Sequence, residues 1–322
     1  MKKLLGKIVL YSILMVLSLE ILIRAFHLYF QYPVVRLNEN EVVNYIPGQE
    51  GAFVLGNRRM TYSRFHINQS GFNSFHEFEP TERNLEVALI GDSFIEGLHQ
   101  DYDNSIGKKI EDDLSGKVKV FEYGFSGYDL ADQLHLIHEF KEDMALIDLA
   151  VIYIKFDEDV RRDHYEVQTR ANLENSLVFK IKREVKLLSY LNGIGLISPI
   201  TDLPKRIKGS VHKNIEIAEK DVDSVAKDQE YIKNLNTLLN TYPIDKKKSV
   251  FLIDRSITSK SFLDYCDSMG YKYLDFGNAL KASSENTVLK YDPMKHWNNH
   301  GRDIVAKVIA EYVDSSVLST SN

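Results

Sequence analysis

The sequence predicts an α/β fold built around a parallel sheet. Short β-rich runs alternate with amphipathic stretches of helical spacing over residues 85–154, and the same alternation returns over residues 249–313. Strand–helix–strand alternation is typical of parallel α/β sheets. Hydrophobic residues make up 44% of the chain and charged residues 27%. This ordinary globular balance excludes wholesale disorder and a multi-span membrane protein.

Length, charge and cysteine content narrow the functional class. A domain has ~150 residues, so the 322 residues of the chain correspond to about two domains, or to one large domain with attachments. The net charge is −6, and no basic excess points to nucleic acid as a partner. Cys266 is the only cysteine, which excludes an internal disulfide and a cysteine-rich zinc site. No cofactor is expected.

The N-terminus predicts a membrane anchor. An apolar run covers residues 8–19, and it reaches the ~20 residues of a membrane span only if Glu20 is tolerated. Glu20 and Arg24 are four residues apart and can pair on one helix face. We expect a single pass through the inner (cytoplasmic) membrane, with the rest of the chain extracytoplasmic, in the periplasm of a Gram-negative source. The lysines expected to stay in the cytoplasm are Lys2, Lys3 and Lys7.

Two alternatives to the anchor stay open. A cleaved signal peptide has the same charged start and apolar run, but no convincing A-x-A cleavage site follows this one. A buried or amphipathic N-terminal helix is the other interpretation.

The elements after the anchor (residues 1–30) follow in order. A juxtamembrane lead-in segment, residues 31–84, is mixed and turn-rich with few clean periods. The domain of residues 85–322 begins with predicted strands at 85–90, 117–123 and 146–154 and predicted helices at 105–114 and 130–140.

The rhythm breaks in the middle of this domain. About residues 161–248 are rich in charge and contain two helix-like pieces, 176–191 and 227–242, which predict a helical insertion or cap. The alternation then resumes with predicted strands at 249–254 and 271–276 and predicted helices at 259–269 and 302–313.

A serine directly after a predicted strand is the candidate nucleophile. Gly91, Asp92 and Ser93 stand at the carboxyl end of strand 85–90, the edge where open α/β sheets bind ligands. Gly91 permits a tight turn, so Ser93 can begin a helix with its hydroxyl exposed. A backbone N–H at this point can face a developing oxyanion. The alternative is a serine that only caps the helix N-terminus.

The segment 291–301 contains the candidate general base. Asn298 and Gly301 are poor residues for a helix interior, so we expect His296 in the loop before the last helix. Asp292 stands four residues earlier. A histidine there can take the serine proton, while the carboxylate fixes the tautomer of the ring and stabilises the imidazolium.

Two other interpretations of this segment remain. His296, His300 and Asp292 have the spacing of zinc ligands, but Trp297 stands where a zinc-protease helix has glutamate, and we expect no metal. The histidines are otherwise simply hydrogen-bonded in a loop. Trp297, beside the base, and Asp92, beside the serine, are candidates for the wall of the site.

The order of these motifs resembles the SGNH (GDSL-type) hydrolase family, in particular its membrane-anchored bacterial members. INQSGFNS resembles the lead-in, ALIGDSFIEGL the nucleophile block, FEYGFSGYDLADQ the second block and HWNNHGRDIVA the last block. The resemblance covers about residues 66–313 without the insertion. It implies a flavodoxin-like, doubly wound sheet, with Ser93 as nucleophile, His296 as base and Asp292 as its acid. The backbone N–H groups of Ser93 and Gly127 are then the oxyanion donors.

One block departs from the family. Where the family has Asn-Asp after a hydrophobic strand, this chain has Glu158 and Asp159. A carboxylate has no N–H to donate, and its charge would oppose an oxyanion. Losing one such donor costs ~10²–10³ in rate. A solvated acidic loop is the other interpretation of this run. Candidates for a substitute donor are Asn104, Asn298 and Lys155.

The sequence favours a serine-dependent ester hydrolase or O-acyltransferase that acts outside the cytoplasm. By family analogy the substrate is an acylated glycan, such as a cell-surface polysaccharide, or another ester. The alternative is a non-catalytic binding or assembly protein of the same fold, because Glu158 would remove one oxyanion donor.

Overall fold

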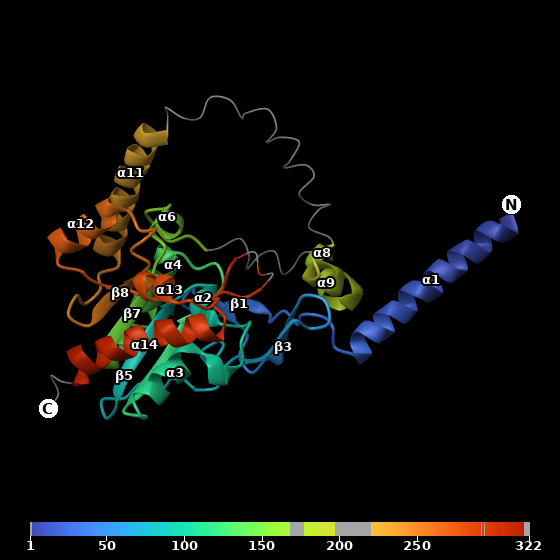
Figure 1. Ribbon diagram of the computed structural model, residues 1–322, viewed down its shortest axis with the longest axis horizontal. Helices are drawn as coiled ribbons and strands as arrows, with labels where there is room; N and C mark the ends of the chain where they lie inside the picture. The colour runs from blue at the N-terminus through green and yellow to red at the C-terminus, as the bar shows by residue number, and fades with distance from the viewer. Residues whose placement is uncertain (1, 168–176, 197–219, 291, 293, 319–322) are drawn as a thin grey trace.

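A parallel sheet of five strands forms the centre of the molecule (Figure 1). The computed structural model describes residues 2–167, 177–196, 220–290, 292 and 294–318. The strands are β5 (Leu85–Gly91), β6 (Val118–Gly124), β7 (Leu149–Tyr153), β8 (Ser249–Ile253) and β9 (Lys272–Asp275). Their spatial order is β6-β5-β7-β8-β9, and every neighbouring pair is parallel. This is the flavodoxin-like order 2-1-3-4-5, so the expected fold class is confirmed.

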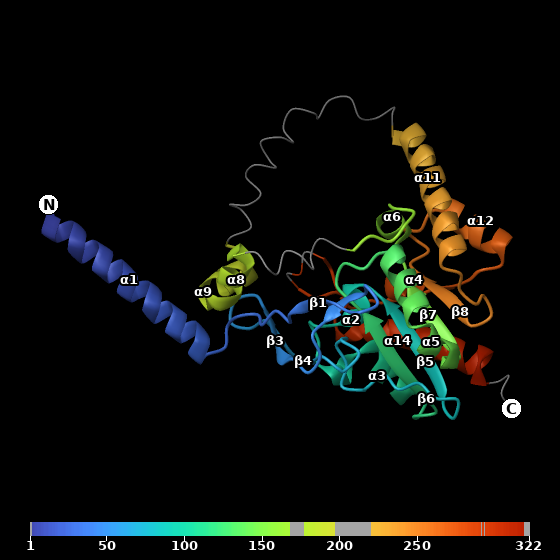
Figure 2. The same cartoon turned by 180° about the vertical axis from the view of Figure 1, so that it is seen from behind.

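Helices cover both faces of the sheet, as Figures 1 and 2 show from opposite sides. One face packs against α4 (Leu130–Glu139), α11 (Lys220–Thr241) and α12 (Lys260–Met269). The other packs against α3 (Ile106–Asp113), α13 (Gly277–Ala282) and α14 (Asn299–Ser316). Along β5, Ala88 and Ile90 belong to the first core, and Val87 and Leu89 to the second. Because both faces are buried, the strand reads as a continuous apolar run.

Short helices complete the domain. They are α2 (Ser93–Glu96), the 3₁₀ turn η1 (Tyr102–Asn104), α5 (Lys141–Leu146) and α6 (Phe156–Asp159). Between α6 and β8 the structure describes α8 (Leu177–Glu184), α9 (Lys186–Gly193) and α11. Residues 168–176 and 197–219 of the predicted insertion lie outside the described residues.

The lead-in segment contains strands that the sequence did not indicate. β1 (Val35–Leu37) pairs with β2 (Val43–Tyr45), and β3 (Glu50–Leu55) pairs with β4 (Thr61–His66), both antiparallel. β4 lacks an apolar alternation because Ser63 occupies one of its buried positions. The Ser63 hydroxyl donates a hydrogen bond to the Leu98 carbonyl at 2.5 Å. This bond ties the hairpin to the loop after α2.

The N-terminal helix α1 (Lys2–Ala25) projects from the body (Figure 1). Among the described residues it is the one helix long and apolar enough to cross a membrane, and Ile23 is its only buried residue. Helices α8 and α9 lie beside its inner end in both views. Glu20 pairs with Arg24 at 2.8 Å, as expected. The helix is thus compatible with a single-pass anchor or with a signal peptide.

Candidate active site

The turn from β5 into α2 places Ser93 at the carboxyl edge of the sheet. Asp92 is the N-cap of α2, and its Oδ1 accepts the Phe94 N–H at 2.9 Å. The capping role weighed for Ser93 therefore belongs to Asp92, and Ser93 is the first helical residue. A Cβ on Gly124 of the neighbouring strand β6 would lie 2.6 Å from the Glu96 Cα. Glycine at this position therefore permits the close approach of α2 to the sheet.

Ser93, His296 and Asp292 form one hydrogen-bonded chain. Ser93 Oγ lies 2.7 Å from His296 Nε2, and His296 Nδ1 lies 2.6 Å from Asp292 Oδ2. The same carboxylate oxygen accepts the backbone N–H of His296 at 2.7 Å. As expected, His296 lies in the loop before α14, whose N-cap is Asn298. A serine, a histidine and a carboxylate in this order can activate the hydroxyl as a nucleophile.

A second histidine, His99, lies next to His296, and the buried Arg302 lies next to His99. The His99 ring centroid is 4.5 Å from that of His296, and Arg302 Nη2 is 3.4 Å from His99 Nε2. Arg302, from α14, also donates to the Phe94 carbonyl at 3.1 Å. Burial, reinforced by the Arg302 charge, holds the pKa of His99 well below its ordinary value. His99 is therefore neutral at neutral pH.

The same surroundings favour the neutral form of the His296 ring. Burial lowers the pKa of His296, and the Asp292 carboxylate only partly opposes this effect. Burial also lowers the pKa of Arg302 to about 10. The sequence did not point to Arg302 or His99. One signal could have found Arg302. It lies three residues before Val305 and seven before Ile309, on the same face of the last helix, and all three side chains are buried.

Ser93 opens into a cavity of about 300 Å³. Its polar wall contains Ser93, Glu96, His99, Ser126, Asp292 and His296. Its apolar and aromatic wall comes largely from the lead-in segment, and consists of Phe30, Tyr32, Pro33, Tyr45, Phe53, Leu55, Leu98 and Leu289. A mostly apolar cavity with a few convergent polar groups is the usual form of a small-molecule site.

Two backbone groups were expected to face an oxyanion. Among the described residues, the Ser93 N–H donates to no protein acceptor. Gly127 lies in the loop between β6 and α4 with φ +89°, a left-handed conformation that suits glycine. The preceding Ser126 N–H donates to Glu96 Oε1 at 3.2 Å. The Ser93 amide therefore remains available to a ligand in the cavity.

Glu158 is not among the residues that line the cavity of Ser93. It lies in α6, its side chain is 57% exposed, and it pairs with Lys155 Nζ at 3.1 Å. Lys155 Nζ also pairs with the buried Asp92 Oδ2 at 2.7 Å. Lys155 thus holds the Glu158 carboxylate and offsets its charge, and a position of Glu158 at the oxyanion stays a prediction.

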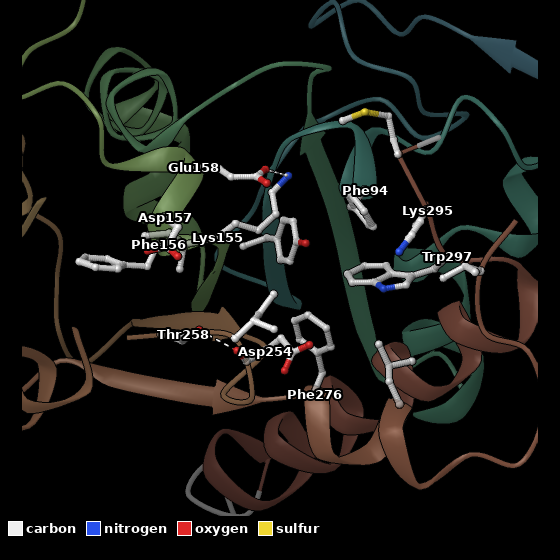
Figure 3. A pocket seen from close by; sticks show the side chains of 16 residues that line it. Phe94, Lys155, Phe156, Asp157, Glu158, Asp254, Thr258, Phe276, Lys295 and Trp297 are labelled. Carbon is white, nitrogen blue, oxygen red and sulfur yellow. Dashed lines mark hydrogen bonds and ion pairs between the residues drawn. The ribbon is translucent and has the colours of Figure 1, made fainter. Parts of the chain in front are cut away.

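Glu158, Lys155 and Trp297 line a neighbouring cavity of about 390 Å³ (Figure 3). Phe94 forms part of the wall between this cavity and the pair of Ser93 and His296. The Phe94 ring centroid lies 4.8 Å from that of Trp297 and 4.7 Å from that of His296. Trp297 is therefore a wall residue of this neighbouring cavity and not of the Ser93 cavity.

The remaining candidates are engaged elsewhere. Asn298 Nδ2 donates to the Asn286 carbonyl at 2.6 Å, and Asn104 lies in η1, outside the lining of the Ser93 cavity. Lys155 is thus the one proposed substitute donor that touches a neighbour of Ser93. His300 Nε2 is 2.8 Å from the Ser283 hydroxyl. In the part of the chain that the structure describes, no group of three or more His, Cys, Asp or Glu side chains is placed to hold a metal.

The fold is similar to that of several solved hydrolases at low identity. A lipase/acylhydrolase from Enterococcus faecalis is 14% identical, with 72% of this chain and 96% of that chain covered and a TM-score of 0.40. A carbohydrate acetylesterase family member from Sinorhizobium meliloti is 10% identical (72% and 99% covered, TM-score 0.37). The psychrotrophic esterase EstA from Pseudoalteromonas sp. is 9% identical (72% and 98% covered, TM-score 0.40). No protein-family model and no curated protein matches the chain.

Proposed function

We propose that this protein is a serine-dependent ester hydrolase or O-acyltransferase. The observation that carries the proposal is the hydrogen-bonded chain from Ser93 through His296 to Asp292, at the wall of an apolar cavity. In this proposal Ser93 is the nucleophile, His296 the general base and Asp292 the group that fixes the tautomer of the ring.

The chemistry follows from these roles. Ser93 Oγ attacks the ester carbonyl carbon while His296 Nε2 takes the hydroxyl proton. The new C–O bond converts the carbonyl into a tetrahedral oxyanion, which the backbone N–H groups of Ser93 and Gly127 stabilise. The bond to the leaving oxygen then breaks, and His296 returns the proton to that oxygen. Water or an acceptor hydroxyl attacks the acyl-serine in the same way and regenerates Ser93.

The experiment uses the full chain in detergent micelles and a fluorophosphonate probe, which phosphonylates an activated serine with loss of fluoride. We expect rapid labelling and turnover of an aryl ester, and we expect Ser93→Ala to abolish both. Ser268→Ala is the matched control, because it removes an exposed hydroxyl of α12 that does not line this cavity. A folded wild-type chain that is neither labelled nor active would contradict the proposal and favour a non-catalytic protein.

In this proposal the chain is anchored in the inner membrane, with its domain outside the cytoplasm. The exposed apolar face of α1 and the lysines at its start support this orientation. An intact chain that stays in the membrane fraction through alkaline carbonate extraction is the expected result. A shortened, extractable chain would replace the anchor with a signal peptide. An acylated cell-surface polysaccharide is then a substrate within reach.

A further inference from the structure

The cavity at Ser93 borders a larger cavity on the side of the lead-in segment. This larger cavity, about 730 Å³, lies between the lead-in strands and α9. Phe30, Tyr32, Phe53 and Leu55 line both cavities. We call the two together the lead-in groove. The wall that the two cavities share is therefore aromatic and aliphatic, while the outer cavity also has polar lining from Asn57, Ser189, Asn192 and Lys290.

Ring contacts trace the same path to the base. The Phe30 ring centroid lies 4.8 Å from that of Phe53, and Phe53 lies 6.2 Å from His99. His99 in turn lies 4.5 Å from His296. A ligand that occupies both cavities would have one end at the cavity that His296 lines.

The outer wall of the groove is fixed to the end of α1. Glu20 in α1 accepts the backbone N–H groups of Lys186 (2.9 Å) and Leu187 (2.7 Å) at the start of α9. At the other end of α9, the Gly193 carbonyl accepts the Gly56 N–H of the lead-in hairpin at 3.1 Å. Helix α9 thus connects the inner end of α1 with the groove, and it lies near that end of α1 in both views (Figures 1 and 2).

The mouth of the groove has the residues of a membrane interface. The turn between β3 and β4 exposes Arg58, Arg59 and Met60, and Met60 lines the groove. The His27 ring, two residues past α1, lies 6.3 Å from the ring of Tyr62, over which Arg59 lies at 3.9 Å, so this turn lies beside the end of the helix. Basic side chains attract anionic headgroups, and exposed apolar side chains enter the headgroup region.

We infer that the lead-in groove binds the acyl chain of an ester lipid drawn from the membrane that holds α1, and brings its carbonyl to Ser93. The inference rests on the proposed function and adds the class of acyl donor. The apolar wall fits a methylene chain, and each methylene that leaves water raises affinity roughly three- to fourfold. The position of the mouth at the end of α1 selects a membrane lipid over a water-soluble ester.

The first test compares two fluorophosphonates on the full chain in vesicles of phosphatidylethanolamine and phosphatidylglycerol. One probe carries an ethyl chain and the other a dodecyl chain. We expect Ser93 to react at least about tenfold faster with the dodecyl probe. Because a long chain also concentrates in the bilayer, the deciding quantity is the change in this rate ratio when the groove is filled.

Gly193→Phe fills the outer part of the groove away from Ser93. A Cβ at Gly193 would lie 3.7 Å from the Val54 carbonyl oxygen, an ordinary contact, so the backbone accepts a side chain there. We expect the ethyl rate to stay the same and the dodecyl rate to fall about tenfold. Leu191→Phe adds the same ring to α9 outside the groove lining and is expected to change neither rate. An unchanged ratio in Gly193→Phe would overturn the inference.

The second test does not depend on catalysis. A phospholipid with a photoactivatable diazirine on its acyl chain is irradiated with the full chain in the same vesicles, and adducts are mapped by mass spectrometry. Adducts on the strip from Phe30 to Phe53 support the groove, and adducts confined to α1 overturn it. If neither fluorophosphonate labels Ser93, the proposed function fails, while the adduct map still decides whether the groove holds a lipid chain.

Discussion

At the residue scale, the burial of His296 sets the pH range of the proposed activity. Only the neutral ring accepts the Ser93 proton, so activity falls as acid protonates it. Because burial lowers the pKa of His296 below its ordinary value of 6.5, we expect the acid limb of kcat/KM to have its midpoint below pH 6.5. Asp292→Asn removes a charge that raises this pKa, so the limb moves further toward acid. The rate also falls about 10⁴-fold, because the tautomer is no longer fixed.

A pH–rate profile of both chains checks this prediction. A midpoint above pH 6.5 in the wild type, or a shift toward alkali in Asp292→Asn, would contradict the assigned roles. Asp303→Asn is a suitable control because that carboxylate belongs to the exposed face of α14.

Lys155 stabilises the turn that carries the nucleophile. Its Nζ pairs with Asp92, whose side chain is 6% exposed and caps α2. Lys155→Met leaves this buried carboxylate without its cation, and we expect unfolding in urea to show a loss of about 3 kcal/mol. Lys155→Arg keeps the charge and is expected to recover most of that loss. Glu158→Gln removes only the exposed ion pair between Glu158 and Lys155, and we expect it to lower the free energy of unfolding by at most about 1 kcal/mol. Equal losses in Lys155→Met and Glu158→Gln would contradict the larger contribution that we assign to the buried pair with Asp92.

Glu158 also offers a direct test of the oxyanion site. If Glu158 occupied the family's asparagine position, Glu158→Asn would restore a donor and raise ester turnover by ~10²-fold or more. In the structure this side chain instead lines the neighbouring cavity and pairs with Lys155. We therefore expect Glu158→Asn to change kcat/KM by less than about twofold. A large gain in steady-state hydrolysis would instead place Glu158 at the oxyanion.

At the element scale, the sequence predicted those helices and strands whose burial produces a local pattern of apolar residues. The apolar run of β5 and the spacing of α4 identify these elements, because burial on one or both faces imposes a period on the sequence. Ser93 and His296 could be found because each stands where a predicted element begins or ends. The β3–β4 hairpin could not, since the buried Ser63 is held by a hydrogen bond that only the folded chain supplies.

The same reason explains which site residues were missed. Arg302 meets His99 from 203 positions away in the sequence, and Lys155, after β7, meets Asp92, after β5. No spacing in the sequence encodes such pairs, because they depend on which strand ends are neighbours in the sheet. The surroundings of Glu158 could not be predicted for the same reason: an alignment orders residues along the chain, whereas its ion pair with Lys155 and its place in the lining of another cavity depend on the fold.

The close packing of α2 on β6 makes a prediction at this scale. Gly124→Ala places a methyl group 2.6 Å from the Glu96 Cα, so α2 must move away from the sheet. Overpacking of this kind costs about 1–3 kcal/mol. A displacement of Ser93 by ~1 Å can slow the reaction by ~10². We expect urea unfolding and fluorophosphonate labelling to show both effects. Gly193→Ala meets only an ordinary contact and is the control; unimpaired labelling in Gly124→Ala would contradict the argument.

At the scale of the whole molecule, two units with different stabilities are joined through the lead-in segment. The sheet and its covering helices share two large buried cores. Helix α9 instead depends on polar contacts, chiefly the Glu20 carboxylate at its N-terminus. Segments with few buried apolar contacts open more readily than a core. The groove wall that α9 forms can therefore loosen while the catalytic chain stays in place.

Glu20→Ala tests this separation. It leaves the amides of Lys186 and Leu187 without their acceptor, and loss of a helix cap costs about 1 kcal/mol. We expect hydrogen exchange in α9 to become about fivefold faster, because the opening free energy falls by that amount. Exchange in β5 and β7 should not change, since their hydrogen bonds lie between buried strands. Lys7→Ala, at the other end of α1, is the control. Faster exchange in the sheet would mean that α9 and the core open as one unit, and the groove could then not admit a chain without loosening Ser93.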